Sequence, residues 1–266
     1  MEGLVIAGAV VLGLLFGSFG NVAIHRWPRG GTIGEPRRSA CPSCAMPIRA
    51  VDNVPVVSWF VLRGRCRRCS APISVRYAIV EALTGLLFGL TLWVHGVDPL
   101  VPAALVFVWS AVVASVIDLE HRIIPNRLTL RLPFVLVPLL VLPAALDGGW
   151  GDLIRALITG VALPGIMFAL SETFRLLRGK QGIGMGDVKF AISIGLVVGY
   201  LGGWHVVVFA YATIISAMVI VVGLLLARRA SLATRIPFGP YLAIGALIAL
   251  LLGDPAVALV QRVLGF

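Results

Sequence analysis

The order of apolar and polar stretches along the chain is typical of a protein that crosses a membrane several times. Eight apolar runs alternate with polar segments, and each run reaches or approaches the ~17–25 residues of a spanning helix. The runs cover residues 4–24, 77–96, 100–118, 128–146, 153–174, 188–201, 204–227 and 236–252. This pattern predicts an all-α polytopic membrane protein with about eight transmembrane helices.

The longest interruption of the pattern is segment 26–76, which is polar, rich in Pro, Gly and Arg, and holds every cysteine of the chain. We therefore expect a first transmembrane helix over 1–25, a small extramembrane cysteine domain over 26–76, a seven-helix membrane domain over 77–253 and a short tail over 254–266. No Lys or Arg precedes the first run, which favours a retained span over a removable signal peptide. Pro133, Pro138 and Pro143 predict a kink or break in the fourth span.

Composition and charge exclude a soluble domain and give an orientation. Of 266 residues, 59% are apolar and only 13% are charged. The net charge of +10 would indicate a nucleic-acid partner in a soluble protein, but here the basic residues are spread over segments that all fall on one side of an eight-span protein. These residues are Arg26, Arg29, Arg37, Arg38, Arg49, Arg63, Arg65, Arg67, Arg68, Arg76, Arg122, Arg127, Arg131, Arg175, Arg178, Lys180, Lys189, Arg228, Arg229 and Arg235. By the positive-inside rule that side is the cytoplasm, and we expect no nucleic-acid partner.

The four cysteines form two Cys-x2-Cys pairs, Cys41 with Cys44 and Cys66 with Cys69. Four thiolates at this spacing are typical of a tetrahedral structural zinc site like that of a zinc ribbon. Two disulfides or a redox pair are the alternatives, and a cytoplasmic location disfavours disulfides. Because four protein ligands leave no open position on the metal, the expected role is to fold the loop rather than to catalyse a reaction.

Two aspartates lie at the edges of apolar runs. Asp118 ends the third run and Asp187 precedes the sixth, so the expected topology places both at one depth, near the cytoplasmic surface. A lone carboxylate in an apolar span is a candidate functional residue. A pair that shares one proton can act as general base and general acid on a peptide bond. The alternative is two separate interfacial charges, with Asp187 as a helix cap.

Other polar residues near the spans have plainer interpretations. Glu120 and His121 fit a solvated interface, and Glu172 fits an i,i+3 pair with Arg175. Glu81 could pair with an arginine or with a substrate amine, and the sequence does not distinguish the two. The segment 236–240 fits a helix that begins with a proline in its first turn.

These motifs together resemble the bacterial type IV prepilin peptidases, the bifunctional leader peptidases/N-methyltransferases of pilus and type II secretion systems. The resemblance extends over nearly the whole chain, in the order of the motifs. The matching segments are residues 17–26, 52–55, 58–59, 62–67, 72–77 with Glu81, 117–118, 124–130, 184–189 and 236–244.

The resemblance implies an enzyme of the bacterial cytoplasmic (inner) membrane. Family members cut a basic leader from type IV prepilins or pseudopilins at the cytoplasmic face, then methylate the new N-terminus with S-adenosylmethionine. It implies that Asp118 and Asp187 are the catalytic pair and that Cys41, Cys44, Cys66 and Cys69 bind structural zinc. No sequence motif indicates the S-adenosylmethionine site. The alternatives are a non-enzymatic membrane scaffold of a pilus or secretion assembly, with a zinc loop that binds partners, and a transporter, which would place its acidic residues near the bilayer midplane.

Overall fold

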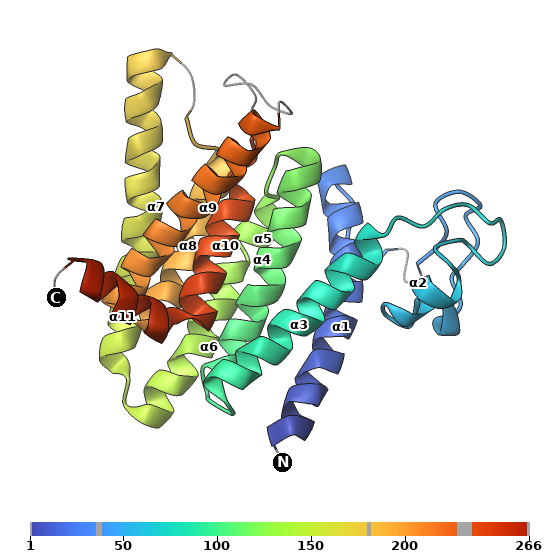
Figure 1. The fold of residues 1–266 in the computed structure, drawn as a ribbon, viewed down its shortest axis with the longest axis horizontal. Coiled ribbons are helices and arrows are strands. Elements are labelled where there is room, and N and C mark those ends of the chain that lie inside the picture. The colour runs from blue at the N-terminus through green and yellow to red at the C-terminus, as the bar shows by residue number, and fades with distance from the viewer. Residues whose placement is uncertain (1, 36–38, 180–181, 228–235, 265–266) are drawn as a thin grey trace. The chain divides into compact units, whose positions relative to one another are not determined.

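The computed structural model describes residues 2–35, 39–179, 182–227 and 236–264 (Figure 1). Six basic residues of the charge pattern and the last two residues of the predicted tail lie outside this range. The six are Arg37, Arg38, Lys180, Arg228, Arg229 and Arg235. The described chain is helical, without a β-strand, and divides into two compact units at residues 96 and 97, each of which is described by itself below.

The first unit is a pair of long helices joined by the cysteine domain. Its elements are α1 (Glu2–Arg26), the 3-10 turns η1 (Trp27–Arg29) and η2 (Ala50–Asn53), α2 (Val57–Val61) and α3 (Arg76–His95). Helices α1 and α3 pack backbone against backbone, because a Cβ atom on Gly17 would lie only 2.7 Å from the Cα atom of Glu81. A Cβ atom on Gly13 would likewise lie 2.8 Å from the Cα atom of Gly85. Small residues at such contacts are a common basis of helix packing in membranes.

The second unit is a bundle of eight described helices. They are α4 (Val101–His121), α5 (Asn126–Thr129), α6 (Leu132–Asp147), α7 (Trp150–Arg178), α8 (Met185–Leu201), α9 (Gly203–Leu226), α10 (Gly239–Leu251) and α11 (Gly253–Leu264). Helix α8 is the core of this unit and contacts α4, α6, α7, α9 and α10 (Figure 1). Its buried side chains include Phe190, which stacks on Phe107 of α4 with ring centroids 6.3 Å apart.

The helices follow the predicted apolar runs, although fewer of them are long enough to span a bilayer by themselves. Among the described residues, six helices are sufficiently long and apolar, and the pair α10–α11 could supply a seventh. Helix α8 has 17 residues and α10 has 13, both short of the ~20 that a straight span needs. The chain is thus an all-α, multi-pass membrane protein.

Three local features complete the bundle. Of the kink or break expected in the fourth span, no break occurs, because helix α6 continues through Pro138 and Pro143. Helices α8 and α9 are separate, because Gly202 between them has a φ of 148°, which ends the helix. Helix α11 bends by 98° from α10.

Candidate functional site

Asp118 lies in the last turn of α4 and is only 5% exposed. The end of α4 is closed by Arg122, whose N–H donates to the backbone oxygen of Asp118 at 2.8 Å. The negative end of a helix dipole disfavours a carboxylate. The Asp118 side chain instead accepts a hydrogen bond at Oδ2 from the backbone N–H of Gly239, 2.9 Å away, at the first residue of α10.

Asp187 lies in the first turn of α8, where the helix dipole favours a negative charge. Its carboxylate reaches back to the N–H of Gly184, the N-cap residue, as the third helical residue does in a capping box. The cap interpretation of Asp187 therefore has some basis, but the cap uses only part of the carboxylate. Oδ1 is buried and has no hydrogen-bond partner among the residues that the structure describes. A buried carboxylate oxygen left unpaired is unusual and marks a candidate reactive group.

The two carboxyl groups act on each other. Helix α10 contacts both α4 and α8 (Figure 1). The charge of Asp118 reaches the Asp187 carboxyl group. Two neighbouring carboxyls of which only one ionises cheaply can divide the roles of base and acid between them. The structure thus brings together, within the second unit, the two aspartates that the sequence singled out.

The segment after α4 joins the two aspartate-bearing ends. A Cβ atom on Gly186 would lie 3.2 Å from the backbone N of Ile124, so the start of α8 packs directly on this segment. Two residues further on, Asn126 accepts a 2.9 Å hydrogen bond from the ammonium group of Lys189. Ser171 of α7 binds the loop before α8 through Ile183, with its hydroxyl 3.1 Å from the carbonyl oxygen. These contacts determine where Asp187 lies relative to α4.

Glu81 makes a structural contact that the sequence did not indicate. It lies in α3 and is only 9% exposed. Its carboxylate accepts a 2.7 Å hydrogen bond from the backbone N–H of Val56, at the start of α2. Ser18 and Asn21 of α1 also interact with it. Glu81 thus connects α1 and α3 to the cysteine domain.

The cysteine domain contains two knuckles of the same design. In the first, Ala40 pairs with Pro47 through an isolated β-bridge, and in the second, Arg65 pairs with Pro72. The fourth residue after the first cysteine of each knuckle has a positive φ, 56° at Ala45 and 58° at Ser70. Each knuckle therefore turns its two sulfurs toward the same point.

The sulfur positions fit a single metal ion. The four Sγ atoms lie within 4.8 Å of one another, and those of Cys41 and Cys69 are 3.8 Å apart. Metal–sulfur bonds of ~2.3 Å in a tetrahedron require sulfurs about 3.8 Å apart. All four cysteines are free thiols, so the disulfide alternative is not formed. The cluster can hold a metal ion with four protein ligands.

The backbone prepares these sulfurs to ionise. The N–H groups of Cys44 and Ser43 lower the pKa of the Cys41 thiol to about 6, and those of Cys69 and Arg68 lower the pKa of Cys66. At Cys69 the N–H of Ala71 favours the thiolate, but burial and the neighbouring sulfurs outweigh it and raise the pKa to about 11. Four crowded thiols cannot all ionise alone, and a bound cation removes that repulsion.

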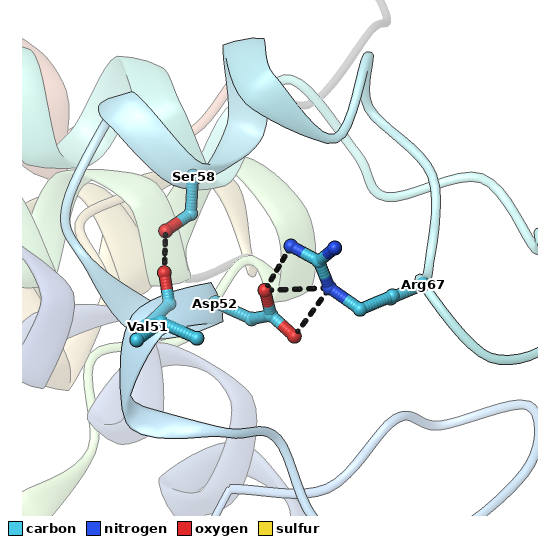
Figure 2. Close-up of polar contacts among 4 residues, drawn as sticks. All are labelled: Val51, Asp52, Ser58 and Arg67. Carbon is cyan, nitrogen blue, oxygen red and sulfur yellow. Dashed lines mark hydrogen bonds and ion pairs between the residues drawn. The ribbon is translucent and has the colours of Figure 1, made fainter.

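An ion pair connects the second knuckle to the turn before α2. The guanidinium group of Arg67 donates to both carboxylate oxygens of Asp52, at 2.7–3.0 Å (Figure 2). This hydrogen bonding, together with the charge of Arg67, lowers the pKa of Asp52. In the same turn as Asp52, the carbonyl of Val51 accepts a 3.1 Å hydrogen bond from the hydroxyl of Ser58 in α2 (Figure 2).

Several residues of the site were not singled out by sequence reasoning. Gly239 was interpreted only as part of a helix start, and Asn126 and Ser171 had no individual role. The segment 236–240 was among the matching motifs, so the signal that it belongs to the site was present. The pair Glu172–Arg175 is confirmed as an i,i+3 ion pair, at 2.7 Å.

Apolar helices, two buried interacting carboxyls and a four-cysteine cluster define a class: a multi-pass membrane protein with an acidic site and a metal-binding domain. Comparisons with known proteins identify the family within this class. A family model described as "Bacterial Peptidase A24 N-terminal domain" matches residues 11–95, and one described as "Type IV leader peptidase family" matches residues 105–227. The chain belongs to the type IV leader peptidase family, as its motifs indicated.

Three curated relatives, each named "Prepilin leader peptidase/N-methyltransferase", show how complete the match is. The protein of Aeromonas hydrophila is 39% identical over 91% of this chain and 88% of its own length. That of Stutzerimonas stutzeri is 36% identical over 94% and 91%, and that of Neisseria gonorrhoeae is 34% identical over 92% and 90%. No solved structure matches the chain.

Proposed function

We propose that this protein cleaves the basic leader from type IV prepilins or pseudopilins and methylates the new N-terminus. The observation that carries the proposal is the pair of buried, interacting carboxyls of Asp118 and Asp187, one of which keeps an oxygen without a partner among the described residues. The family and the names of the relatives give the substrate class, and these two carboxyls give the hydrolytic chemistry.

The two carboxyls would share one proton before the reaction. The ionised one takes a proton from water as that water attacks the scissile carbonyl carbon, while the protonated one gives its proton to the carbonyl oxygen. The C–N bond of the tetrahedral diol then breaks. The carboxyl that took a proton from water gives it to the leaving amine, and the other carboxylate takes back a proton from a diol hydroxyl as the new carboxylic acid forms. Both carboxyls return to their starting states, so the site is ready for another substrate.

The position of the two carboxyls at helix ends fits the proposed prepilin substrate. Asp118 and Asp187 lie at helix ends, not at mid-helix, as expected for cleavage where a polar leader meets an apolar helix. We propose that these helix ends face the cytoplasm of a bacterial inner membrane, on the evidence of the basic segments. A basic leader would then remain in the cytoplasm while the pilin helix stays in the bilayer.

The metal and the methyl donor complete the proposal. We assign zinc to Cys41, Cys44, Cys66 and Cys69, where it would hold the two knuckles together. S-adenosylmethionine would supply the methyl group that the released amine accepts. The metal has a structural role, because its four protein ligands leave no position for a substrate.

The test is cleavage of a prepilin peptide with a basic leader and a Gly-Phe junction, followed by mass spectrometry with and without S-adenosylmethionine. Asp118→Asn and Asp187→Asn should each lower the cleavage rate by at least about 1,000-fold, since each removes one of two acid–base groups. Asp147→Asn, the same change at an exposed aspartate, is the control. Normal cleavage by either dyad variant would favour a non-enzymatic scaffold instead.

A further inference from the structure

The first turn of α10 offers a single free backbone N–H, and Asp118 accepts it. The N–H groups of Tyr241 and Leu242 both donate to the carbonyl of Phe238, at 3.1 and 3.3 Å. Pro240 has no N–H. The remaining amide, that of Gly239, donates to Asp118 Oδ2 at 2.9 Å. The positive end of α10 is therefore directed at one carboxylate oxygen.

Asp118 needs such a partner because of where it lies in its own helix. It occupies the last turn of α4, where the unpaired carbonyl groups disfavour a negative charge. The N-terminus of α10, 121 residues further along the chain, offsets this effect with a positive helix end and a hydrogen-bond donor. Asp187 needs no such donor from another helix, because it lies in the first turn of α8, at the positive end of its own helix.

The same contact leaves no room for a side chain at residue 239. A Cβ atom there would lie 2.8 Å from Asp118 Oδ2 and 3.0 Å from the Cδ1 atom of Ile124. Gly239 does not have a positive φ, so glycine is not required by the backbone conformation. What glycine provides is space for the carboxylate to reach the amide.

We propose that the N-terminus of α10 is the third component of the catalytic site and that Gly239 is a positioning residue, which holds Asp118 in the orientation that the reaction needs. The inference rests on the proposed peptidase function. It assigns to segment 236–240 a role in catalysis, in addition to the start of a helix.

The main test compares glycine-to-alanine variants on the prepilin peptide. Gly239→Ala should lower kcat about 100-fold, the size of effect expected from a displacement of about 1 Å, with KM changed less than about threefold. Gly165→Ala, in α7, adds a Cβ with nothing within 4 Å and serves as the matched control. Thermal midpoints of the two variants should agree within a few degrees. A kcat for Gly239→Ala within about threefold of the control would overturn the inference.

Ile124→Val separates positioning from packing, because it removes the Cδ1 atom near residue 239. The double variant Gly239→Ala/Ile124→Val should keep the low kcat, since the contact with Asp118 remains. Recovery to the level of Ile124→Val alone would mean that glycine is needed only for packing, and would overturn the inference.

Hydrogen exchange supplies a measurement that does not depend on a glycine variant. Asp118→Asn keeps a carbonyl oxygen that can accept the Gly239 N–H, whereas Asp118→Ala has no acceptor. Exchange at Gly239 should be at least about tenfold faster in Asp118→Ala than in Asp118→Asn, and equal rates would refute the proposed contact. Normal cleavage by Asp118→Asn would overturn the peptidase function itself, whereas an inactive Asp118→Asn beside a fully active Gly239→Ala would overturn only the role of α10.

Discussion

The backbone N–H of Val56 donates a 2.7 Å hydrogen bond to the carboxylate of Glu81. Val56 has a φ of 62° and a ψ of −54°, a conformation that a β-branched residue rarely adopts and that requires about 1–3 kcal/mol of compensation. The buried carboxylate of α3 supplies part of that compensation. The contact thus connects a strained turn of the cysteine domain to a membrane helix.

This contact predicts different results for two substitutions of Glu81. Glu81→Gln keeps an oxygen that can accept the Val56 N–H, whereas Glu81→Ala leaves that N–H without an acceptor, at about 1–3 kcal/mol. We expect the amides of Val56 and of α2 to exchange with solvent about 10-fold faster or more in Glu81→Ala, and only slightly faster in Glu81→Gln. Hydrogen exchange followed by mass spectrometry makes the comparison. Equal exchange in both variants would show that the hydrogen bond does not hold this turn.

The Glu81 contact also shows what a sequence does not reveal. The positions of the helices follow from the apolar runs, because each spanning segment must be apolar along most of its length. The partner of Glu81, by contrast, is a backbone N–H 25 residues away. Every residue except proline has such a group, so residue type gives no indication of which amide a carboxylate will bind.

The acidic site likewise combines residues that could be predicted from the sequence with one that could not. Asp118 and Asp187 could be predicted, because a carboxylate at the edge of an apolar run is costly and is rarely found there without a function. The donor at Gly239 could not, since it is again a backbone group on a distant helix. The prolines of α6, which predicted a kink or a break, do not break the helix, because neighbouring helices can support a proline-containing helix in a membrane.

The ion pair of Asp52 and Arg67 predicts a modest effect on metal retention. Asp52→Asn or Arg67→Gln should each speed metal transfer to a chelator a few-fold, and the exchange of charges in Asp52→Arg/Arg67→Asp should partly restore the slow rate. Because the pKa of Asp52 is lowered in the fold, its contribution is complete above its ordinary pKa of about 3.9 and is lost only as the pH falls further. The effect should therefore be constant between about pH 6 and 8.

Arg68→Gln is the matched control for this pair. It removes the same charge from the next residue, which is exposed and makes no ion pair with Asp52. If Arg68→Gln speeds metal release as much as Arg67→Gln, the effect comes from the general positive charge around the knuckle and not from the ion pair.

Metal removal should affect the two proposed activities unequally. We expect about one metal ion per chain, and Cys44→Ser should lose most of it, because three sulfurs do not complete the tetrahedron. Ser43→Ala, one residue away, should retain the metal. Loss of metal should make residues 39–75 sensitive to protease and reduce methylation more than leader cleavage, since the two aspartates are not part of that domain. Elemental analysis and the two assays test this, and an equal loss of both activities would instead indicate general misfolding.

The packing of α7 on α8 predicts which glycines of the bundle can be replaced. A Cβ atom on Gly195 would lie within 3.0 Å of the backbone of both Thr159 and Gly160, atoms that cannot move without separating the helices. Gly195→Ala should therefore lower stability by about 1–3 kcal/mol and the thermal midpoint by several degrees. Gly165→Ala, on the same α7 but in open space, should leave the midpoint unchanged or raise it slightly. Because α8 carries Asp187, Gly195→Ala should also slow leader cleavage at temperatures well below its midpoint. A Gly195→Ala protein as stable as Gly165→Ala would mean that α7 and α8 are not in backbone contact.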